Sequence, residues 1–293
     1  MNLECIVTLA NRAVRLHFLA MERSLRATGC HLPVKVIPYN DDRFPLPANS
    51  IWWEIPELTA WLTRWRAHPT MRKYQCLLAT NYQFVDADVC FLRNPVGVLA
   101  SLEGFVTSCG HWHNPAETTT SQSRQWFMAR STTWQKSIFN TGQFACERAL
   151  YDLPGLVAKA ESPLFAQTCL SHRYHEQPGV NLLVGASGVP VHNLTLPPWN
   201  MQSTWAGDYP GDFRAYWRSE ASTPYLIHWA GVDRTVSRPI NGLFLDFLTV
   251  AEREEWQQQT VTVKRLRRKE GWLRHGARRI RGAWRALKGE RWR

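Results

Sequence analysis

The chain has 293 residues, of which 44% are hydrophobic and 20% are charged. These values exclude both a disulfide-stapled miniprotein and a disordered chain. The formal net charge is +11, yet thirteen of the 35 Lys and Arg and only two of the 24 Asp and Glu lie from Lys264 onward. The formal charges of residues 1–263 therefore sum to zero, which argues against an extended nucleic-acid-binding face. The sequence predicts a globular domain over 1–263, a basic tail over 264–293 and no nucleic-acid partner.

The cysteines and the N-terminal residues indicate the cellular compartment. The seven cysteines are spread along the chain, and none forms a C-x-x-C pair. Their neighbours are mostly apolar, so we expect buried free thiols in a reducing compartment. Glu4 lies where a signal peptide would become apolar, and no stretch reads as a transmembrane helix. These features predict a cytoplasmic protein.

The first half of the body alternates strand and helix patterns. We expect strands over residues 3–9, 33–39 and 82–92 and helices over 12–28 and 57–76. A strand, a helix and a strand at this spacing form a βαβ unit, which predicts a parallel sheet with a right-handed crossover.

The second half of the body is less regular. Residues 105–145 mix short apolar runs with a polar loop at 116–125. Further strands are expected at 180–184, 189–192 and 225–229. The whole pattern predicts an α/β fold in a single domain.

The strongest chemical signal is an Asp-x-Asp motif, Asp86 and Asp88, at the end of an apolar strand. Hard divalent cations prefer carboxylate oxygens, and the phosphates of a substrate can complete the coordination. An acidic pair next to an apolar strand is unfavourable unless something is paired with it. A solvated turn is the alternative interpretation of the same two residues.

Three further segments break an apolar run with polar residues or glycine. The segment 225–231 carries His228, whose imidazole can complete a metal site begun by two carboxylates. Residues 138–142 run from apolar side chains into Asn and Gly, and residues 175–183 place two polar pairs ahead of an apolar strand. Each segment also has a plain structural interpretation, as a core histidine, a hairpin turn and a loop.

In this order the segments resemble the GT-A-type nucleotide-sugar glycosyltransferases, and most closely glycosyltransferase family 8, the group of glycogenin and the lipopolysaccharide galactosyltransferases. The matching positions are Thr8–Asn11, Asn40-Asp41, Asp86-x-Asp88, Phe139–Gly142, Glu176-Gln177 with Asn181, and His228-x-x-Gly231-x-x-Arg234. Arg234 stands where the family usually has Lys, and Glu176 where it usually has Asp. The resemblance covers about residues 3–240 and implies one GT-A, Rossmann-like domain with a mostly parallel central sheet.

The resemblance also implies roles for these residues. Asp86, Asp88 and His228 would ligate a Mn²⁺ or Mg²⁺ ion, which acts as a Lewis acid for the leaving nucleoside diphosphate. Glu176 and Gln177 would be the catalytic residues. The donor-binding residues would be Thr8, Ala10, Asn11, Tyr39, Asn40, Asp41, Lys73, Asp86, Ala87, Asn140, Gly142, Asn181, Gly231 and Arg234.

The implied function is transfer of a hexose from UDP-hexose or GDP-hexose to a hydroxyl of a glycan or lipid-linked acceptor. Glu176 acting as a general base would give inversion, whereas the resemblance to family 8 favours retention. One alternative is a GT-A-fold nucleotidyltransferase, which would need a glycine-rich phosphate loop where Thr8–Asn11 has no glycine. The other is a noncatalytic protein that binds sugar or nucleic acid.

The tail over 264–293 predicts a helix that lies on a membrane surface. Its Trp, Leu and Ile residues recur at helical spacing beside an Arg-rich face, a pattern typical of helices in the headgroup region of an anionic leaflet. This pattern predicts a peripheral protein on the inner face of the membrane and suits a lipid-linked intermediate of polysaccharide synthesis as the acceptor.

The chain has fifteen tryptophans, which is many for this length. Aromatic faces stack on the apolar sides of sugars, so we expect some of them, from clusters that include Trp205 and Trp217, to line an acceptor groove. Core packing is the plainer role for any single one. His111 and His113 flank Trp112, but two ligands are too few to predict a second metal site.

Overall fold

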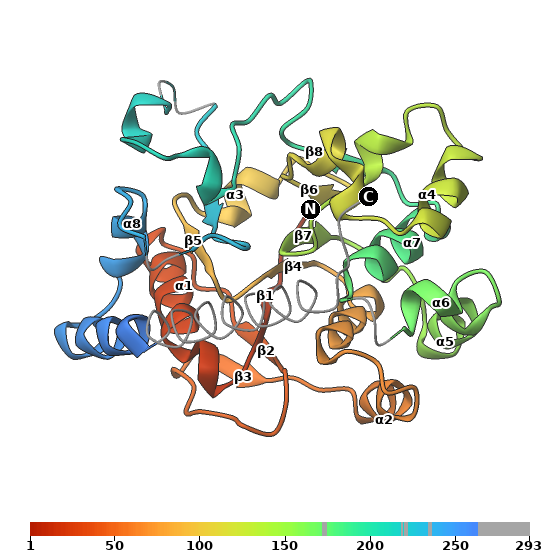
Figure 1. Cartoon of the computed structure of the whole chain (residues 1–293), viewed down its shortest axis with the longest axis horizontal. Coiled ribbons are helices and arrows are strands. Elements are labelled where there is room, and N and C mark those ends of the chain that lie inside the picture. The colour runs from red at the N-terminus through yellow and green to blue at the C-terminus, as the bar shows by residue number, and fades with distance from the viewer. Residues whose placement is uncertain (172–174, 218, 220–221, 234–235, 263–293) are drawn as a thin grey trace, which may run out of the picture.

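The computed structural model describes residues 1–171, 175–217, 219, 222–233 and 236–262 (Figure 1). A central sheet has the strand order β3-β2-β1-β4-β7-β6-β8. Its strands are β1 (Cys5–Ala10), β2 (Val34–Pro38), β3 (Ser50–Trp52), β4 (Tyr82–Val85), β6 (Phe105–Thr107), β7 (Gln143–Cys146) and β8 (Val191–Asn193). A second, two-stranded sheet pairs β5 (Val89–Phe91) with β9 (Leu226–His228).

The central sheet is mostly parallel. Strand β1 pairs in parallel with β2 and with β4, with Ile6 opposite Val34 and Cys5 opposite Tyr82. Strand β7 is antiparallel to both of its neighbours, β4 and β6. The prediction of an α/β fold with a mostly parallel sheet is confirmed.

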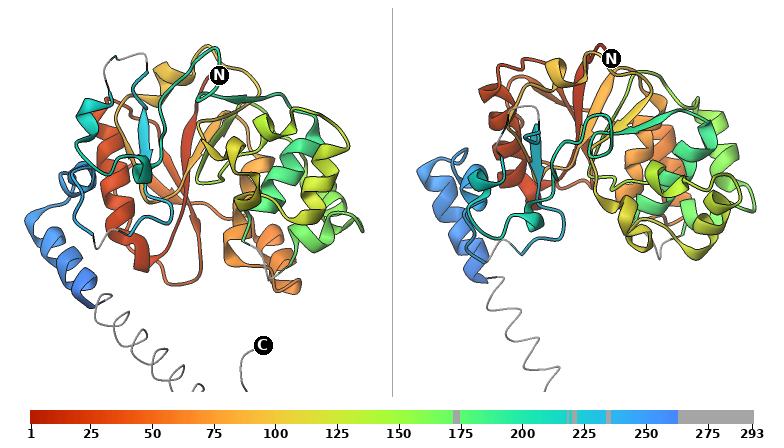
Figure 2. Two further views of the ribbon diagram at one scale, coloured as in Figure 1. Left: turned by 45° about the horizontal axis from the view of Figure 1, so that its top comes forward. Right: turned by 90° about the horizontal axis from the view of Figure 1, so that it is seen from above.

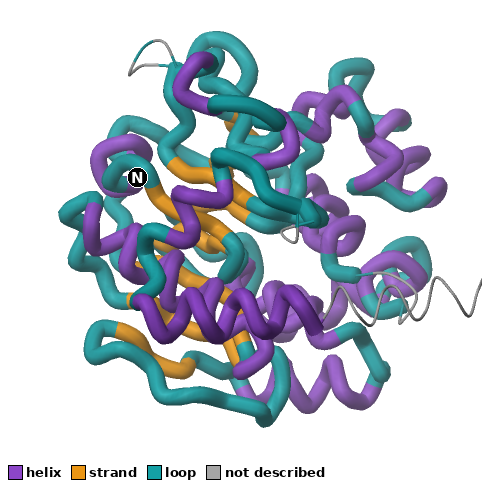
Figure 3. The backbone as a smooth tube through the Cα atoms, turned by 60° about the vertical axis from the view of Figure 1, so that its left-hand side comes forward, coloured by secondary structure: helices purple, strands orange, loops and turns teal. Residues whose placement is uncertain are grey.

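Helices cover both faces of this sheet, as Figures 2 and 3 show. They are α1 (Arg15–Ala27), α2 (Pro56–Arg64), α3 (Pro95–Leu99), α4 (Ser121–Met128), α5 (Leu153–Glu161), α6 (Ala166–Cys169), α7 (Gln177–Ser187) and α8 (Asn241–Leu245), and residues 250–262 are also helical. Alternate strand residues point to opposite faces. Ile6 packs with Phe18 and Met21 of α1, whereas Val7 packs in the cluster that contains Leu182 of α7.

The structure divides two elements that the sequence predicted as continuous. The strand expected over 82–92 is two strands, β4 and β5, which belong to different sheets and are separated by a turn at Asp86–Asp88. The helix expected over 57–76 is α2 followed by a 3₁₀ helix, Pro69–Leu78. Pro69 cannot continue a helix because it lacks the backbone N–H donor.

Two further predictions are wrong. The strand expected at 180–184 is the middle of helix α7, in which Gly179 to Val184 are all buried. The polar loop expected at 116–125 becomes helix α4 from Ser121 onward. There the side chains of Thr120 and Ser123 form a reciprocal capping box that starts the helix.

Cysteine state and membrane-spanning potential were also predicted from the sequence. All seven cysteines are free and buried, as expected. Over the part of the chain that the structure describes, no helix has both the length and the apolar character needed to cross a bilayer. The tail over 264–293 lies outside the described residues.

Candidate metal and donor site

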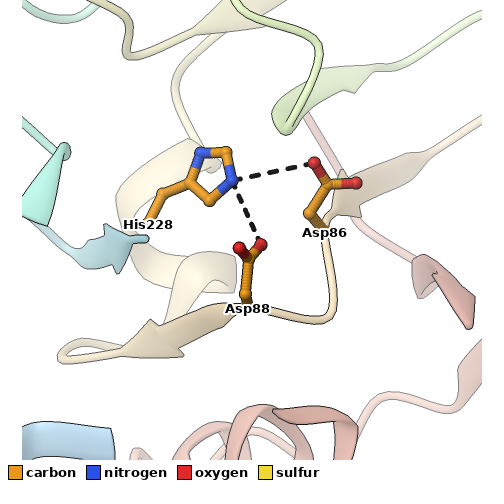
Figure 4. Close-up of side chains that lie close together, drawn as sticks. All are labelled: Asp86, Asp88 and His228. Atoms are coloured by element: carbon orange, nitrogen blue, oxygen red, sulfur yellow. Dashed lines mark ion pairs between the residues drawn. The ribbon is translucent and has the colours of Figure 1, made fainter. Parts of the chain in front are cut away.

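Backbone pairing brings the Asp-x-Asp motif and the distant histidine together. The motif occupies the turn between β4 and β5, and β9 runs antiparallel to β5 with His228 opposite Val89. The amide N–H of Asp86 donates to the carbonyl of Gly142 at 2.7 Å. The side chains of Asp86, Asp88 and His228 therefore converge on one point (Figure 4).

The geometry of these three side chains fits a divalent cation. The Nε2 atom of His228 lies 3.2 Å from Oδ1 of Asp88 and 3.7 Å from Oδ2 of Asp86, and one ligand atom from each residue lies within 4.8 Å of the others. His228 is only 5% exposed, and its Nε2 makes no hydrogen bond. Because this buried Nε2 faces two carboxylates without a hydrogen bond to either, an ion held by one imidazole and two carboxylates would complete the arrangement.

A glycine makes room for this imidazole. A Cβ atom on Gly142 would lie 2.0 Å from Cε1 and 2.7 Å from Nε2 of His228, so any larger residue would collide with the ring. The amide N–H of Gly142 donates to Oδ1 of Asn140 at 2.8 Å. Asn140 and Gly142, both predicted as donor-site residues, therefore lie beside the candidate metal ligands.

Lys73 joins the Asp-x-Asp motif to Glu176. Its Nζ lies 2.8 Å from Oδ1 of Asp86 and 2.6 Å from Oε1 of Glu176, and the side chain is 3% exposed. Burial opposes the charge on Lys73, but the two carboxylates outweigh it and raise the lysine pKa above its ordinary value. Burial likewise opposes ionisation of Glu176, but the Lys73 ammonium and hydrogen bonds from Lys73, Thr70 and Thr141 lower its pKa to about 2.

A first pocket of about 400 Å³ opens at the carboxyl ends of the central strands, where α/β sheets bind ligands. Its lining residues are Leu9, Ala10, Asn11, Ala13, Val14, His17, Tyr39, Asp86, Ala87 and Asp88. Ala10, Asn11, Tyr39, Asp86 and Ala87 were predicted as donor-binding residues, and the structure gathers all five here.

Three residues predicted for the same pocket do not line it. Thr8 lies inside β1 and is completely buried, because both faces of this strand are covered and all six of its residues are buried. Asn40 and Asp41 lie in the turn after β2 and are exposed to solvent. In that turn the Asn40 side chain accepts a hydrogen bond from the amide of Asp42.

A second pocket, of about 480 Å³, is lined by Asn140, which precedes Gly142, and by Ala230 and Gly231, which follow β9. Its lining residues are Gly110, His111, His113, Asn114, Glu117, Asn140, Gln177, Ser203, Trp205, Asp208, Ala230 and Gly231. Asn140, Gln177 and Gly231 were predicted site residues. The Nε2 atom of His111 lies 2.9 Å from Oε2 of Glu117. Glu117 was not predicted as a site residue, because it lies in a polar loop and belongs to no recognisable motif.

The other four predicted residues have different outcomes. Asn181 does not line either pocket, because its side chain hydrogen-bonds both the amide and the carbonyl of Phe139 and so fixes the backbone that precedes Asn140. Arg234 lies outside the described residues. Glu176 is buried at the N-terminus of α7 and contacts Lys73 and Thr141, while Gln177 reaches the second pocket.

Comparison with known proteins supports the fold assignment. No protein-family model and no curated protein sequence matches the chain. The chain is similar to the solved apo structure of the bifunctional glycosyltransferase WbbM, with 12% identity and a TM-score of 0.54 over 87% of this chain and 51% of WbbM. It is also similar to the glycosyltransferase GlyE of Streptococcus pneumoniae TIGR4, with 10% identity and a TM-score of 0.46 over 89% of this chain and 64% of GlyE.

The chain therefore spans about half the length of WbbM. At this level of identity the similarity concerns the fold alone. Together with the sheet order, it shows a GT-A-like glycosyltransferase fold. The predicted fold class is confirmed, while membership of glycosyltransferase family 8 stays a prediction.

Proposed function

We propose that the chain is a divalent-metal-dependent glycosyltransferase that moves a hexose from a nucleoside-diphosphate sugar to a hydroxyl acceptor. The observation that carries the proposal is the buried Nε2 of His228, which faces Asp86 and Asp88 and has no hydrogen bond (Figure 4). Further support is that Asp86 and Asp88 line the first pocket, at the carboxyl ends of the central strands, where ligands of α/β proteins bind.

Asp86, Asp88 and His228 would hold the ion. Mg²⁺ prefers oxygen ligands, so the imidazole favours Mn²⁺ of the two ions. When bound, the ion supplies a Lewis acid that withdraws charge from the leaving diphosphate. Lys73 fixes the orientation of the Asp86 carboxylate through its 2.8 Å ion pair, so this ligand needs little reorganisation to bind the ion.

The first pocket suits the nucleoside of the donor. Its volume of about 400 Å³ and its mostly apolar wall, with the ring of Tyr39, offer a surface for a base. The side chain of Asn11 offers an amide for hydrogen bonding. Because Asp86 and Asp88 form one end of this pocket, the diphosphate of a UDP-hexose or GDP-hexose would extend toward the candidate metal ligands.

Glu176 is a poor general base because its pKa is about 2 and Lys73 holds its charge. This property argues against inversion with Glu176 as the general base. We therefore assign Glu176 a positioning role through Lys73 and Thr141. Gln177, which lines the second pocket, is then the residue proposed to contact the transferred sugar.

We further propose that the acceptor is a glycan or a lipid-linked intermediate, and that the protein works at the cytoplasmic face of a membrane. Support for the membrane comes only from the sequence of 264–293, whose basic and aromatic residues alternate at helical spacing.

A thermal-shift screen of UDP-hexoses and GDP-hexoses, with and without Mn²⁺, tests the proposal. A donor that binds only the folded state at about 100 times its Kd stabilises it by about 2.7 kcal/mol. We expect one donor class to raise the Tm of the wild-type protein only with Mn²⁺, and to raise that of Asp88→Asn little. Asp246→Asn, a change at an exposed aspartate far along the chain, is the matched control. Failure of every nucleotide sugar to shift the wild-type Tm contradicts the proposal.

A further inference from the structure

The second pocket has an exposed tryptophan, Trp205, in its wall. This residue is 42% exposed although its neighbours Thr204 and Ala206 are buried. Tryptophan carries a large apolar area and usually buries most of it. Trp205 therefore presents an exposed aromatic surface in the wall of this pocket.

The indole is held rigidly in place. Its Nε1–H donates to the carbonyl of Ala230 at 2.8 Å. Gly207 lies against its six-membered ring, since a Cβ on Gly207 would be 2.4 Å from both Cζ2 and Cη2. With its only polar group already bonded, the indole offers a ligand nothing but an apolar aromatic surface.

This surface is also fixed relative to the candidate metal ligands. The backbone of Trp205 forms a bridge with His228, and the amide N–H of His228 donates to the carbonyl of Thr204 at 2.7 Å. The side chain of Thr204 in turn donates to the carbonyl of Ser108. A ligand on the indole would therefore lie at a set position beside His228.

The rest of the second pocket is polar. Besides Trp205 it presents the side chains of His113, Asn114, Asp208 and Gln177. A pyranose ring has the matching composition, because its C–H bonds gather on a face while its hydroxyls point outward from the edge. The C–H groups carry partial positive charge and are attracted to the negative face of an aromatic ring, and the contact removes apolar area from water.

We propose that Trp205 is the stacking platform for the acceptor sugar, so that the acceptor is a carbohydrate whose ring lies against the indole in the second pocket. This inference rests on the proposed function, because the transferred hexose must arrive from the side of the metal ligands. It makes Trp205 a residue that selects the acceptor and leaves the binding of the nucleoside to the first pocket.

Methyl glycosides of glucose, galactose, mannose and N-acetylglucosamine are the probes, observed by saturation-transfer NMR. We expect at least one to receive saturation at its ring C–H protons from the wild-type protein. We expect Trp205→Ala and Trp205→Leu to weaken its binding about tenfold, and Trp205→Phe to retain part of it. The matched control is Trp65→Ala, because Trp65 is also 42% exposed and its Nε1 also donates a hydrogen bond, to Glu161, but it lies outside the pocket.

Binding of UDP and GDP with Mn²⁺ to the same variants separates this inference from the proposed function. We expect the nucleotide bound by the wild-type protein to bind all variants equally. Glycoside binding that is unchanged in Trp205→Ala, or nucleotide binding that is lost there, overturns the inference. Nucleotide binding without any glycoside binding by the wild-type protein also overturns it but leaves the proposed function standing. Trp205-dependent glycoside binding without nucleotide binding supports the platform and contradicts the proposed function.

Discussion

Lys73 balances the negative charges of two carboxylates in the candidate site. It is buried, and it is the counterion of both Asp86 and Glu176. Removal of one partner from a buried ion pair leaves an uncompensated charge in a medium that solvates it poorly.

Lys73→Met should therefore lower the free energy of unfolding by about 3–5 kcal/mol. The change keeps most of the side-chain volume, so the loss reports charge rather than packing. Urea denaturation monitored by circular dichroism measures it, with Lys136→Met at an exposed lysine as the control. A loss no larger than that of the control would mean that Lys73 does not hold the two carboxylates as described.

The imidazole of His228 can occupy its position only because Gly142 has no side chain. Gly142→Ala would place a methyl group 2.0 Å from Cε1 of this ring and force the ring to move. Displacing a ligand in this way should weaken Mn²⁺ binding by about ten- to a hundredfold. Isothermal titration calorimetry with Mn²⁺ and the nucleotide measures the change. Gly97→Ala, where an added Cβ meets no atom within 4 Å, should bind normally, and equal affinity of both variants would contradict the geometry.

At the scale of elements, the helical residues 250–262 are tied to α1 by two carboxylates, Glu252 and Glu255, which pair with Arg23 and Arg15. Glu252 accepts hydrogen bonds from Nη1 and Nη2 of Arg23 at 2.5 and 2.9 Å. It also accepts the amide of Thr249, whose hydroxyl receives the amide of Glu252 in return, which is a capping box. The hydrogen bonds from Arg23 lower the pKa of Glu252 from 4.5 to about 2, against a smaller opposing effect of burial.

This pKa predicts a pH-dependent contribution to stability. A carboxylate whose pKa is lower in the folded state stabilises fully above its unfolded pKa and loses this effect as pH falls through the folded value. Glu252→Gln should cost about 1 kcal/mol at pH 7, because Arg23 is partly exposed and solvent screens the pair. Urea titrations should show this difference shrinking between about pH 4.5 and pH 2. A difference that stays constant over this range would exclude the ion pair as its source.

The sequence predicts the first elements well because each strand or helix there has its own periodicity. Strands β1 and β2 and helix α1 lie within a few residues of their expected positions. Helix α7 was mistaken for a strand because it is buried over six successive residues, and a helix buried on all sides shows no amphipathic period. The short strands β6 and β7 are defined by pairing with distant partners, which local sequence does not reveal.

The candidate site likewise contains some residues that could be predicted from the sequence and others that could not. Asp86, Asp88 and His228 could be predicted because carboxylates and a histidine at strand ends have a recognisable chemistry. The ion pair between Lys73 and Glu176 joins residues 103 positions apart, so only the folded chain brings them together. Thr8 was misplaced because a polar residue in a strand can be fully buried when both faces of the sheet are covered, as they are along the whole of β1.

At the scale of the whole molecule, the candidate site has two separate pockets that share no lining residue. The first pocket is lined from β1, the residue after β2 and the Asp-x-Asp turn, while the second is lined by the segments around Gly110, Ser203 and Ala230. Under the proposed function the donor nucleoside binds in the first pocket and the acceptor in the second. A residue change in one pocket should then affect one ligand and not the other.

The basic tail over 264–293 predicts a membrane attachment for the molecule. Each Lys or Arg near an anionic surface contributes about 1 kcal/mol, so the full chain should sediment with anionic liposomes at low salt and be released at high salt. The chain ending at Val263 should stay in the supernatant while its Tm remains unchanged. Equal sedimentation of both forms would show that the tail is not the anchor and would remove the support for a lipid-linked acceptor.

The central claim is that Asp86, Asp88 and His228 hold a divalent cation that binds a nucleoside diphosphate. The most direct measurement is a Mn²⁺ titration followed by electron paramagnetic resonance, with UDP or GDP present. The account predicts one tightly bound Mn²⁺ per wild-type chain. Loss of a direct ligand in Asp88→Asn or His228→Phe should weaken binding by at least the ten- to hundredfold, roughly, that loss of an outer-shell partner costs, with Asp246→Asn unaffected. Mn²⁺ binding of equal strength in wild type, Asp88→Asn and His228→Phe, or no binding to the wild-type protein at all, would contradict it.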